Sequence, residues 1–565
     1  MSSFVQEPSS MASRGVDPKR SLAGLDPESR QMVLDTVAQL KKKLLTKEKI
    51  LEFDRREIFP EEVIREMLGP DIGLQLLMIP EAYGGLGGGA RDSCAVTREM
   101  AKICLGVTTA FFAIQLGADP ILVGATEEQK QKWLGRIAAG EALVAYAVTE
   151  PDAGSNVAAL KTKAEPVPDA SGRITGYRIN GNKQFISTGG YADFITVLAD
   201  APEGPTFFIM EKETAGYQRG KGEEKHGIRA SNTSPLTFTD AFVPVENLIG
   251  ILPGQGLKQA NEVFGYTRLM VASMGLGAGE AALEIAIPYA KERIQFKTPL
   301  SEKQGYTHKL IVPNVVRLEA AAAYIDEVAE RLDAGEKDLE VEGSIAKWFA
   351  TEAGNRAAED GIQALGGYGY ITEYGVEKIK RDVRITTIYE GTSEIQQNII
   401  STFRWKKSRK TKGGFYGAMA AEMEQLEAAR PGCGGRYYAL AARALNHLVV
   451  MADTHRLTRQ QIVMFDLAEL MAHVEVGVAV ARRADTLAAA GDPQAERAAL
   501  VARIFAREVC ELFERCSLRI LTGTGGIAPD TASGSLAEIR LNEFADSCRN
   551  VIRDMDRLAD IVFGR

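Results

Sequence analysis

Apolar residues recur at helical spacing over most of the chain, and one long interruption divides this pattern. Residues 27–67 mix charged and apolar positions, as in "VLDTVAQLKKKLLTKEKILEF", and helical spacing continues to about residue 140 beyond the Gly-rich loop "IPEAYGGLGGGA". Long Ala- and Leu-rich stretches with the same spacing cover residues 256–293, 307–335 and 340–365. Apolar positions every three to four residues are typical of amphipathic helices, so the chain is expected to be mainly α-helical.

The interruption spans residues 160–250, where β-branched and aromatic residues alternate with Gly, Asn and Asp turns, as in "GRITGYRINGNKQFISTGGYADFITVLA". This alternation predicts short antiparallel strands. The patterns together predict a mainly α protein with a β-barrel-like middle domain and six regions in order: a flexible tail (1–26), an N-terminal helical domain (27–145), a middle β-domain (146–255), a helical bundle (256–405), a basic linker (406–414) and a further helical domain (415–565).

The last domain has the features of a decayed repeat of the bundle. "AKWFATEAGNRAAEDGIQALGG" (346–367) aligns with "ARIFAREVCELFERCSLRILTG" (502–523) at an offset of 156, with identities that include Phe349/Phe505 and Gly367/Gly523. Two Ala-rich amphipathic helices that share a core pattern by chance are the alternative. The distal copy has no counterpart of "YEGT", and no strand domain precedes it.

Composition narrows the function classes. The 565 residues carry a net charge of −8, which argues against a general nucleic-acid binder. Six scattered cysteines, without CxxC, and five scattered histidines, without HExxH, give no metal site, and they indicate a reduced, cytoplasmic setting. No run approaches 18 apolar residues, so no membrane span is expected. The Ser-rich N-terminus lacks an apolar core; a frayed tail is favoured over an organelle transit peptide.

Two segments flanking and entering the β-domain have the residues of a ligand loop. "AYAVTEPDAGSN" (145–156) offers hydroxyl groups, and Gly154 allows a ligand to approach the backbone; a plain helix-to-strand loop is the alternative. In "KQFISTGG" (183–190), Phe185 can cover a planar ring and Ser187 can bond its rim, although a core aromatic is the commoner explanation. The G-x-G-x-x-A in "GLGAGEAALE" (275–284) follows no strand, so close helix crossing explains it better than dinucleotide binding.

Three segments of the bundle carry candidate chemistry. "ERIQFKTPL" (292–300) holds Arg293, which can neutralise a phosphate or simply complement a helix C-terminus. "IQALGGYGYITEY" (362–374) pairs Gln363 with two glycines that permit close backbone contact. In "IYEGTSEIQQ" (388–397), Ser393 to Gln396 fits a capping box, which predicts a helix start near residue 394. Glu390 precedes that start, either as a catalytic carboxylate or as an ordinary partner of a helix N-terminus.

Eight segments, taken in order, resemble the acyl-CoA dehydrogenase family of flavoproteins. They are "IPEAYGGLG", "ATEEQKQKWL", "AYAVTEPDAGSN", "KQFISTGG", "GIRASNTSPLTFTDAFVPVENLIG", "ERIQF", "LGGYGYITEY" and "IYEGTSEIQ", and they span about residues 50–405. The resemblance implies a helical domain, a β-domain and a four-helix bundle, with FAD held non-covalently between the last two and an acyl-CoA stacked against the flavin.

The resemblance also assigns residues. Glu390 matches the catalytic base, and Thr267 stands where some members place that base instead. Substrate positions match Phe264, Arg268, Tyr389 and Gly391. Cofactor positions match Tyr146, Val148, Thr149, Gly154, Ser155, Phe185, Ile186, Ser187, Arg293, Gln295, Phe296, Gln363, Gly366, Gly367, Thr392 and Glu394. Of these, Arg293, Gln295 and Phe296 match a segment that reaches the FAD of a neighbouring protomer, with Gln363, Gly366 and Gly367 on the other side of that shared site; Thr392 and Glu394 match positions near the ADP part.

The implied reaction is α,β-dehydrogenation of an acyl-CoA, with electrons passed to an electron-transfer flavoprotein. An acyl-CoA oxidase using O₂ and a catalytically silent scaffold are the alternatives. The C-terminal block resembles the extension of the very-long-chain branch, which implies a homodimer. "RWKKSRK" is expected to be a solvated linker, with weak contact to anionic lipid as the alternative. The acyl group stays open; Gln115 is compatible with a polar, short or dicarboxylic chain, or with a simple helix contact.

Overall fold

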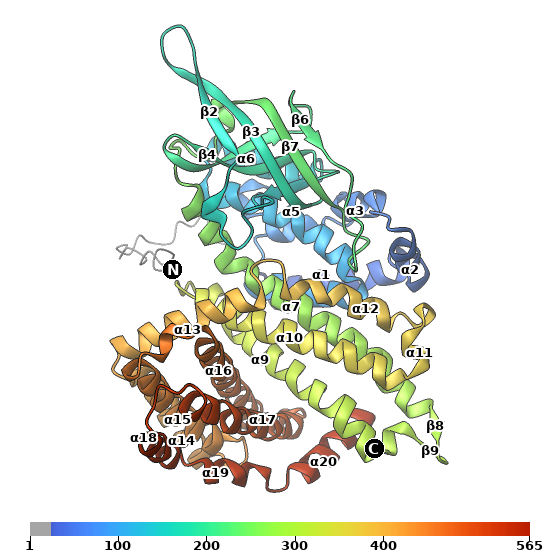
Figure 1. The fold of residues 1–565 in the computed structure, drawn as a ribbon. Helices are drawn as coiled ribbons and strands as arrows, with labels where there is room; N and C mark the ends of the chain where they lie inside the picture. Colours follow the sequence, from blue (N-terminus) through green and yellow to red (C-terminus); the bar gives the residue numbers. More distant parts are fainter. Residues whose placement is uncertain (1–23) are drawn as a thin grey trace.

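A computed structural model describes residues 24–565, and the predicted tail lies outside the described residues up to residue 23. An N-terminal helical domain, a strand domain and two groups of helices follow in the predicted order (Figure 1). The first domain comprises α1 (Pro27–Lys43), α2 (Lys47–Arg56), α3 (Glu61–Leu68), α4 (Ala90–Ile103), α5 (Leu105–Gly124) and α6 (Glu127–Ala138).

α5 is the element that joins this domain to the rest. Its residues are apolar on every side and nearly all buried, as expected of a helix enclosed by other elements. It packs against strands β1 and β4 of the sheet and against helices α7 and α12 of the bundle. Any group on α5 that faces the bundle is therefore shielded from water.

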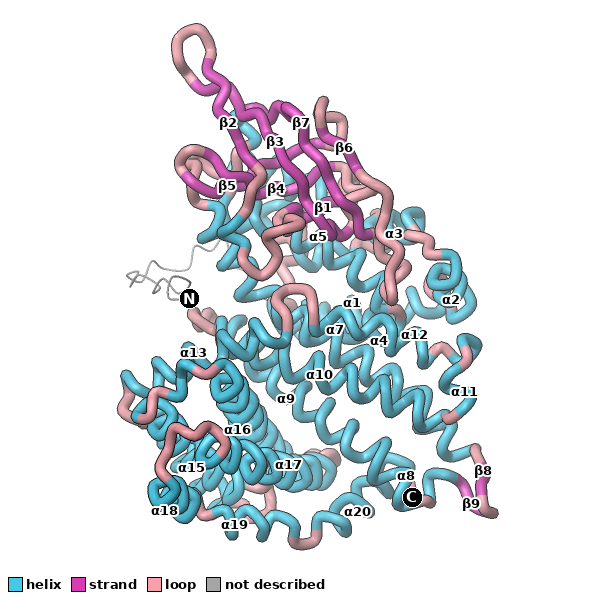
Figure 2. The backbone as a smooth tube through the Cα atoms, viewed as in Figure 1, coloured by secondary structure: helices cyan, strands magenta, loops and turns pink. Residues whose placement is uncertain are grey.

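The middle domain is a curled seven-stranded sheet in the order β1-β4-β2-β3-β7-β6, with β5 paired to β4 (Figure 2). The prediction of antiparallel strands holds for most pairs, but β4 runs parallel to its neighbours β1 and β2. The strands are β1 (Val144–Ala147), β2 (Lys163–Pro168), β3 (Ile174–Ser187), β4 (Phe194–Ala201), β5 (Gly204–Glu211), β6 (Tyr217–Arg219) and β7 (Thr233–Pro244). An irregularity in the β3–β7 register between Lys183 and Ile186 re-aims the side chains at the end of β3.

The bundle follows as α7 (Gly256–Glu292), the hairpin β8 (Ile294–Gln295) and β9 (Thr298–Pro299), α8 (Gln304–Tyr306), α9 (Val312–Asp333), α10 (Glu340–Leu365), α11 (Gly367–Tyr370), α12 (Val376–Val383) and α13 (Ser393–Lys410). The predicted crossing at the glycines of residues 275–284 is confirmed. A Cβ on Gly275 would lie 2.8 Å from the Thr351 Cα, and one on Gly277 would lie 2.3 Å from the Arg98 carbonyl oxygen. Backbone-close packing of α7 on α10 and α4 therefore explains these glycines.

The predicted linker at 406–414 is wrong for most of its length, because α13 continues to Lys410 and only Thr411–Gly413 form a turn. Arg404 and Ser408 are buried, so this helix is packed against neighbours rather than solvated all round. Its basic side chains also contact aromatic rings. The Lys407 ammonium, for example, lies 4.4 Å from the centre of the Phe415 ring. Cations on aromatic faces explain the sequence of this segment without a lipid partner.

The C-terminal domain comprises α14 (Gly414–Ala429), α15 (Gly435–Thr454), α16 (Gln461–Ala489), α17 (Ala495–Thr522), α18 (Pro529–Ile539), α19 (Leu541–Ala545) and α20 (Val551–Phe563). It docks on the bundle through α16 and α17, which pack against α9, and through the contact of α16 with α13 (Figure 1).

Within the described residues, two helices are long and apolar enough to cross a membrane by length and composition. They are α5 and α7, and 83% and 78% of their most apolar windows are buried against other elements. That burial is typical of core helices.

Candidate active site

Glu390 lies in a strained turn between α12 and α13. Its φ is +55°, and the φ of Gly391 is +85°, so two successive residues adopt the left-handed conformation. For a residue with a side chain this costs on the order of 1–2 kcal/mol, which surrounding contacts must offset. The left-handed backbone at position 391 favours glycine, and a Cβ there would also lie 2.6 Å from the Gln396 Nε2 and displace that amide.

The helix start that follows differs by one residue from the prediction. Thr392, not Ser393, is the N-cap, and its hydroxyl accepts a hydrogen bond from the Ile395 N–H at 3.4 Å. Ser393 donates to the Glu352 Oε1 at 2.6 Å. Gln396 does not close a capping box but donates from Nε2 to the carbonyl oxygens of Glu390 (2.9 Å) and Gly391 (3.2 Å). The motif therefore holds the Glu390 turn as well as starting the helix.

The Glu390 side chain is half-buried near three polar side chains from other helices. The Thr267 hydroxyl of α7 donates to Glu390 Oε2 at 3.2 Å. Burial raises the Glu390 pKa above its usual range, opposed by the Thr267 hydrogen bond and by the charges of Lys347 and Arg268. Thr267 is the residue that the resemblance matches to the alternative position of the base, and its hydroxyl lies against Glu390. A threonine hydroxyl cannot act as that base, so Glu390 remains the candidate.

The substrate residues carried over by resemblance lie around this carboxyl, as far as they are described. Arg268 is buried and donates from Nη1 to the Glu340 carbonyl oxygen at 3.3 Å, while its Nε has no hydrogen-bond partner among the described residues. The Tyr389 hydroxyl lies 3.1 Å from the Met274 Sδ, and burial raises its pKa. The side chain of Phe264 lies outside the described residues.

The two predicted flavin segments of the β-domain are brought together. The Gln184 N–H donates to the Thr149 carbonyl oxygen at 2.8 Å, which ties the 146–155 loop to the end of β3. Beyond this bond the β3 irregularity turns Phe185 outward with φ +60° and 63% of its surface exposed, beside buried Ile186 and half-buried Ser187. Gly154 and Ser155 are exposed, and Tyr146 and Val148 form the inner side of the loop.

A buried ion pair that the motifs alone did not single out supports this loop. Lys183, fully buried, donates from Nζ to Glu150 Oε1 (2.8 Å) and to the Val148 carbonyl oxygen (3.0 Å). Glu150 also accepts from the Lys161 and Thr162 N–H groups. Burial lowers the Lys183 pKa to about 8, against the opposing pull of Glu150. A lysine inside an otherwise strand-like run, together with the glutamate of "TEP", was the signal in the sequence.

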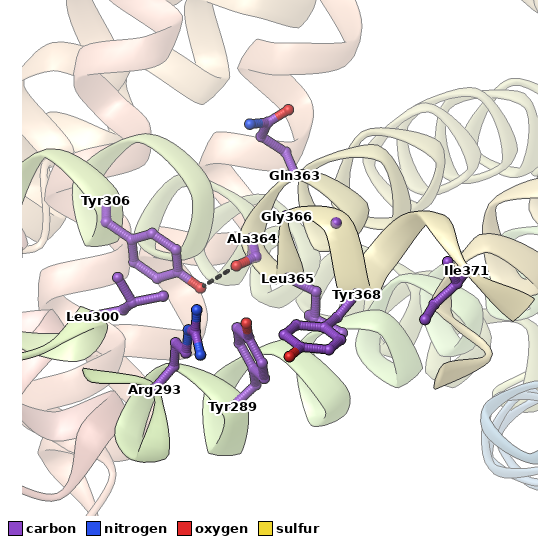
Figure 3. Close-up of a pocket in the computed structure, with 11 residues that line it drawn as sticks. Tyr289, Arg293, Leu300, Tyr306, Gln363, Ala364, Leu365, Gly366, Tyr368 and Ile371 are labelled. Atoms are coloured by element: carbon purple, nitrogen blue, oxygen red, sulfur yellow. Dashed lines mark hydrogen bonds between the residues drawn. The ribbon is translucent and has the colours of Figure 1, made fainter. Parts of the chain in front are cut away.

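A second group of predicted residues lines a cavity of about 490 Å³ near the C-terminal ends of α7 and α10 (Figure 3). Arg293, Gln363, Gly366 and Gly367 share this cavity, so the residues matched to opposite sides of a shared site lie together on one chain. A Cβ at either glycine would meet nothing within 4 Å, which leaves backbone groups open. A guanidinium beside open glycine backbone suits a diphosphate.

Gln295 and Phe296 do not line this cavity but lie on the neighbouring β8–β9 hairpin, where 92% of the Phe296 surface is exposed. Thr392 and Glu394 lie at the start of α13, also away from the cavity. One chain therefore presents cofactor-type residues in separate places. An outward aromatic ring beside a loop, and a cation with open glycines at the other end, fit the two halves of a flavin dinucleotide.

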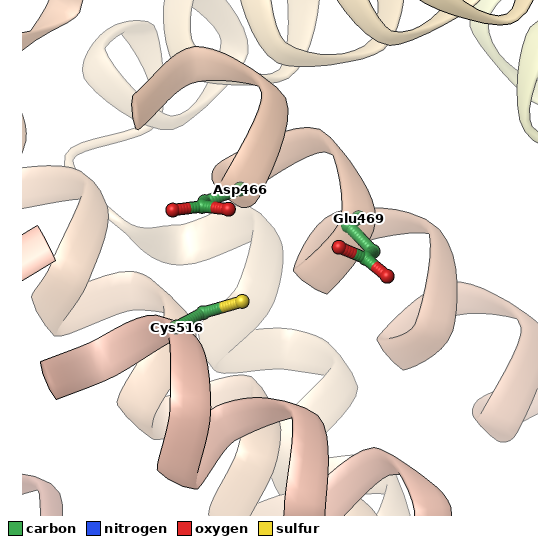
Figure 4. A group of neighbouring side chains, drawn as sticks. All are labelled: Asp466, Glu469 and Cys516. Carbon is green, nitrogen blue, oxygen red and sulfur yellow. The ribbon is translucent and has the colours of Figure 1, made fainter. Parts of the chain in front are cut away.

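Asp466, Glu469 and Cys516 form a group of metal-type ligands in the C-terminal domain (Figure 4). Arginines account for its charge: Arg519 forms a two-pronged ion pair with Asp466, and Arg515 lies 3.2 Å from Glu469 Oε2. Burial raises the pKa of the Cys516 thiol to about 12, so it is not a thiolate ligand near neutral pH. The group is explained by helix packing.

Comparisons with known proteins identify the family of all three domains. Family models for the N-terminal, middle and C-terminal domains of acyl-CoA dehydrogenases match residues 27–141, 145–241 and 254–403. An acyl-CoA dehydrogenase of Bacillus subtilis is 38% identical over 380 residues, which are 66% of this chain and 96% of the relative.

Solved structures extend the match. A structure of the electron transferring flavoprotein of Acidaminococcus fermentans aligns with TM-score 0.62 and 34% identity over 67% of this chain and 98% of that chain. An acyl-CoA dehydrogenase complexed with FAD from Bacillus anthracis shares the fold over 96% of this chain and 97% of its own, with TM-score 0.82 and 24% identity, so the additional C-terminal helices belong to the shared fold. The chain is therefore an FAD-dependent member of the acyl-CoA dehydrogenase family.

Proposed function

We propose that this oxidoreductase, which acts on CH–CH groups, converts an acyl-CoA thioester to the trans-2-enoyl-CoA, with Glu390 as the base that removes the α-proton. The observation that carries the proposal is the half-buried Glu390 carboxyl, which accepts a hydrogen bond from Thr267 and lies in a left-handed turn that Gly391 continues. We place the activity in fatty acid β-oxidation in the cytoplasm, a setting that fits six free cysteines.

Burial suits Glu390 to this task. Removal from water raises its pKa, which makes the ionised carboxylate a stronger base towards a weakly acidic α-proton. Lys347 and Arg268 oppose that shift and favour the ionised form before substrate binds. The N–H of Glu390 makes no hydrogen bond to the chain described here, so it is free to donate to the thioester carbonyl as negative charge develops there.

FAD, when bound, supplies the acceptor for the β-hydride. The 146–155 loop and the end of β3, with Phe185 and Ser187, would hold the flavin edge, and the Glu150–Lys183 pair keeps that loop in place. Arg293 with Gly366 and Gly367 would hold the diphosphate half of a cofactor.

Replacement of Glu390 by Gln tests the base. The amide keeps the shape of the side chain and cannot take the proton, so FAD content should stay normal while flavin reduction by an acyl-CoA falls by at least about 10³-fold. Glu128→Gln, an exposed change on α6 at a residue with no role in the predicted site, is the matched control and should stay within about twofold. Near-normal flavin reduction in the Glu390 variant, measured by stopped flow, would exclude this assignment.

Two measurements would identify the acyl group of the substrate and the electron acceptor. Anaerobic titration with a panel of short, long, branched and dicarboxylic acyl-CoAs identifies the substrate by flavin bleaching, and Gln115 keeps polar chains in that panel. An electron-transfer flavoprotein is the acceptor we propose, and an oxidase is the runner-up. Peroxide formed in proportion to turnover under air would support the oxidase. A colourless protein that binds no FAD would instead support a scaffold.

We further propose that the protein works as a homodimer, because one chain leaves the cofactor residues apart. Large apolar side chains beside the Arg293 cavity are exposed, among them Phe296 (92%), Tyr370 (83%) and Ile294 (60%). A second copy would cover them and bring the cavity to the partner's flavin segments.

Phe296→Ser combined with Ile294→Ser should yield monomers with at least tenfold weaker FAD binding in sedimentation and flavin-release assays. Dimers with normal FAD binding would refute the proposal, and Ile552→Ser, an exposed change in α20, serves as the control.

A further inference from the structure

Lys347 is a fully buried lysine of α10 that lies directly under the Glu390 turn. Its Nζ donates to the Gly391 carbonyl oxygen at 2.6 Å. No carboxylate lies within ion-pair distance of it among the described residues. Burying an ammonium group without a directly paired carboxylate costs folding free energy. Packing alone therefore does not explain a lysine at this position.

The contact acts on a strained segment. Glu390 and Gly391 are both left-handed, and their two carbonyl oxygens are held by the Gln396 amide on one side and, at Gly391, by Lys347 on the other. Loss of either donor would let the turn relax towards ordinary backbone angles. The aim of the Glu390 carboxyl therefore depends on a residue that does not touch it.

Lys347 also acts through its charge. The groups that interact electrically with Glu390 come from four other elements: Thr267 and Arg268 on α7, Lys347 on α10, Asp119 on α5 and Tyr146 on β1, with Tyr389 beside it in the turn. Only Lys347 and Arg268 are cations, and Arg268 is already bonded to Glu340. Burial lowers the Lys347 pKa to about 8, although Glu390 and Glu352 oppose that shift, so it carries charge near neutral pH.

We propose that Lys347 is a positioning residue for the base: it anchors the Gly391 carbonyl so that the turn aims Glu390, and its charge keeps the Glu390 carboxyl ionised before substrate binds. The inference rests on the function proposed for Glu390. The Lys347 ammonium has both roles, as anchor of the turn and as source of charge. Its removal should therefore change both the rate and the pH dependence of proton abstraction.

The test compares Lys347→Met with Lys347→Arg in the FAD-loaded enzyme. Flavin reduction by a saturating acyl-CoA is followed by anaerobic stopped flow from pH 5 to 9. Glu390 must be ionised to act, so the rate falls on the acid side. Loss of the cation stabilises the protonated form, so Lys347→Met should move the acid limb up by about one pH unit or more and slow reduction about tenfold or more at pH 6. Lys347→Arg should leave the limb within about 0.3 units of the parent.

A merely structural lysine would give a different result. Lys347→Met would then lose FAD or thermal stability and slow reduction equally at every pH, with the acid limb unmoved, and that outcome overturns the proposal. If Lys347→Met does not fold, Lys347→Gln replaces it; failure of all three variants to bind FAD would assign Lys347 to folding and also overturn the proposal. Glu390→Gln, measured in parallel, shows separately whether Glu390 is the base.

Discussion

Asp119 is the residue whose environment is hardest to reconcile with packing alone. Its side chain is buried in α5, one carboxyl oxygen has no hydrogen-bond partner within the described part of the chain, and burial with the nearby charge of Glu390 raises its pKa well above the usual range. A carboxyl that holds its proton more tightly when folded stabilises the protein least at high pH. Stability is lost as pH rises from the unfolded pKa towards the folded one.

Replacement of Asp119 by Asn should therefore stabilise the protein in a pH-dependent way. The amide needs no deprotonation, so the variant should gain about 1–3 kcal/mol at pH 8. The gain should shrink as the pH falls and vanish only below the ordinary Asp pKa, where the Asp119 carboxyl is protonated in the unfolded as well as in the folded state. Thermal unfolding at pH 5 and pH 8 measures this difference, with exposed Asp71→Asn as the control. An equal effect of Asp119→Asn at both pH values would show that charge is not the cause.

At the scale of elements, the sequence predicts the bounds of a helix well where apolar periodicity determines them, and less well where tertiary contacts determine them. The bounds predicted for the bundle helices, 256–293 and 340–365, match α7 and α10 within a residue. Both helices pack against other elements along most of their length, so apolar residues recur at helical spacing over many turns. Long, strongly periodic helices of this kind are the elements that a sequence predicts best. The N-cap was predicted one residue too late, at Ser393 instead of Thr392, and the continuation of α13 to Lys410 was missed. A cap depends on one hydroxyl, and a basic run is helical or not according to what it packs against.

The candidate site follows the same division. Glu390, Phe185 and Arg293 were recognisable from short motifs whose order matched a family. Lys183, Lys347 and Asp119 were not, since a buried charge is defined by partners far away in the chain. Lys347 and Asp119 are polar residues in otherwise apolar helix patterns, which is a signal that sequence reasoning can use. Lys183 lies between Asn182 and Gln184, so the apolar pattern of its strand does not single it out.

At the scale of the molecule, helices of the C-terminal domain and of the bundle end at positions related by one constant offset in the sequence. α9 and α16 end at Asp333 and Ala489, and α12 and α18 end at Val383 and Ile539, in both cases 156 residues apart. Phe349 and Phe505, equivalent under that offset, meet edge to face with ring centres 5.6 Å apart. Equivalent residues that meet each other are the mark of two-fold packing. We propose that residues 415–565 are a decayed copy of the bundle; a rotation far from about 180° between α9–α10 and α16–α17 would contradict this.

The two helical units are joined by a buried charge cluster, and its removal should loosen the molecule at that interface. Arg404 of α13 bonds Glu475 of α16 at 2.7 and 2.8 Å and lies 3.0 Å from Glu342 of α10, with all three side chains buried. Arg404→Met leaves two carboxylates buried without this cation, at a cost of about 3–5 kcal/mol that falls on the docking of the C-terminal domain. Calorimetry should then show its unfolding at a temperature several degrees lower, separated from that of the bundle.

Arg409→Met, on the same helix with 60% of its side chain exposed, should change stability by no more than about 0.5 kcal/mol, because exposed ion pairs contribute little. Arg404→Met combined with Glu475→Leu should recover more than half of the loss, since an apolar pair replaces a carboxylate left without its cation. Recovery would show that the cost lies in the unpaired charge. A double variant as unstable as Arg404→Met alone would place it instead in the packing of α13 against α16, and the cluster would then not be what holds the second helical unit to the first.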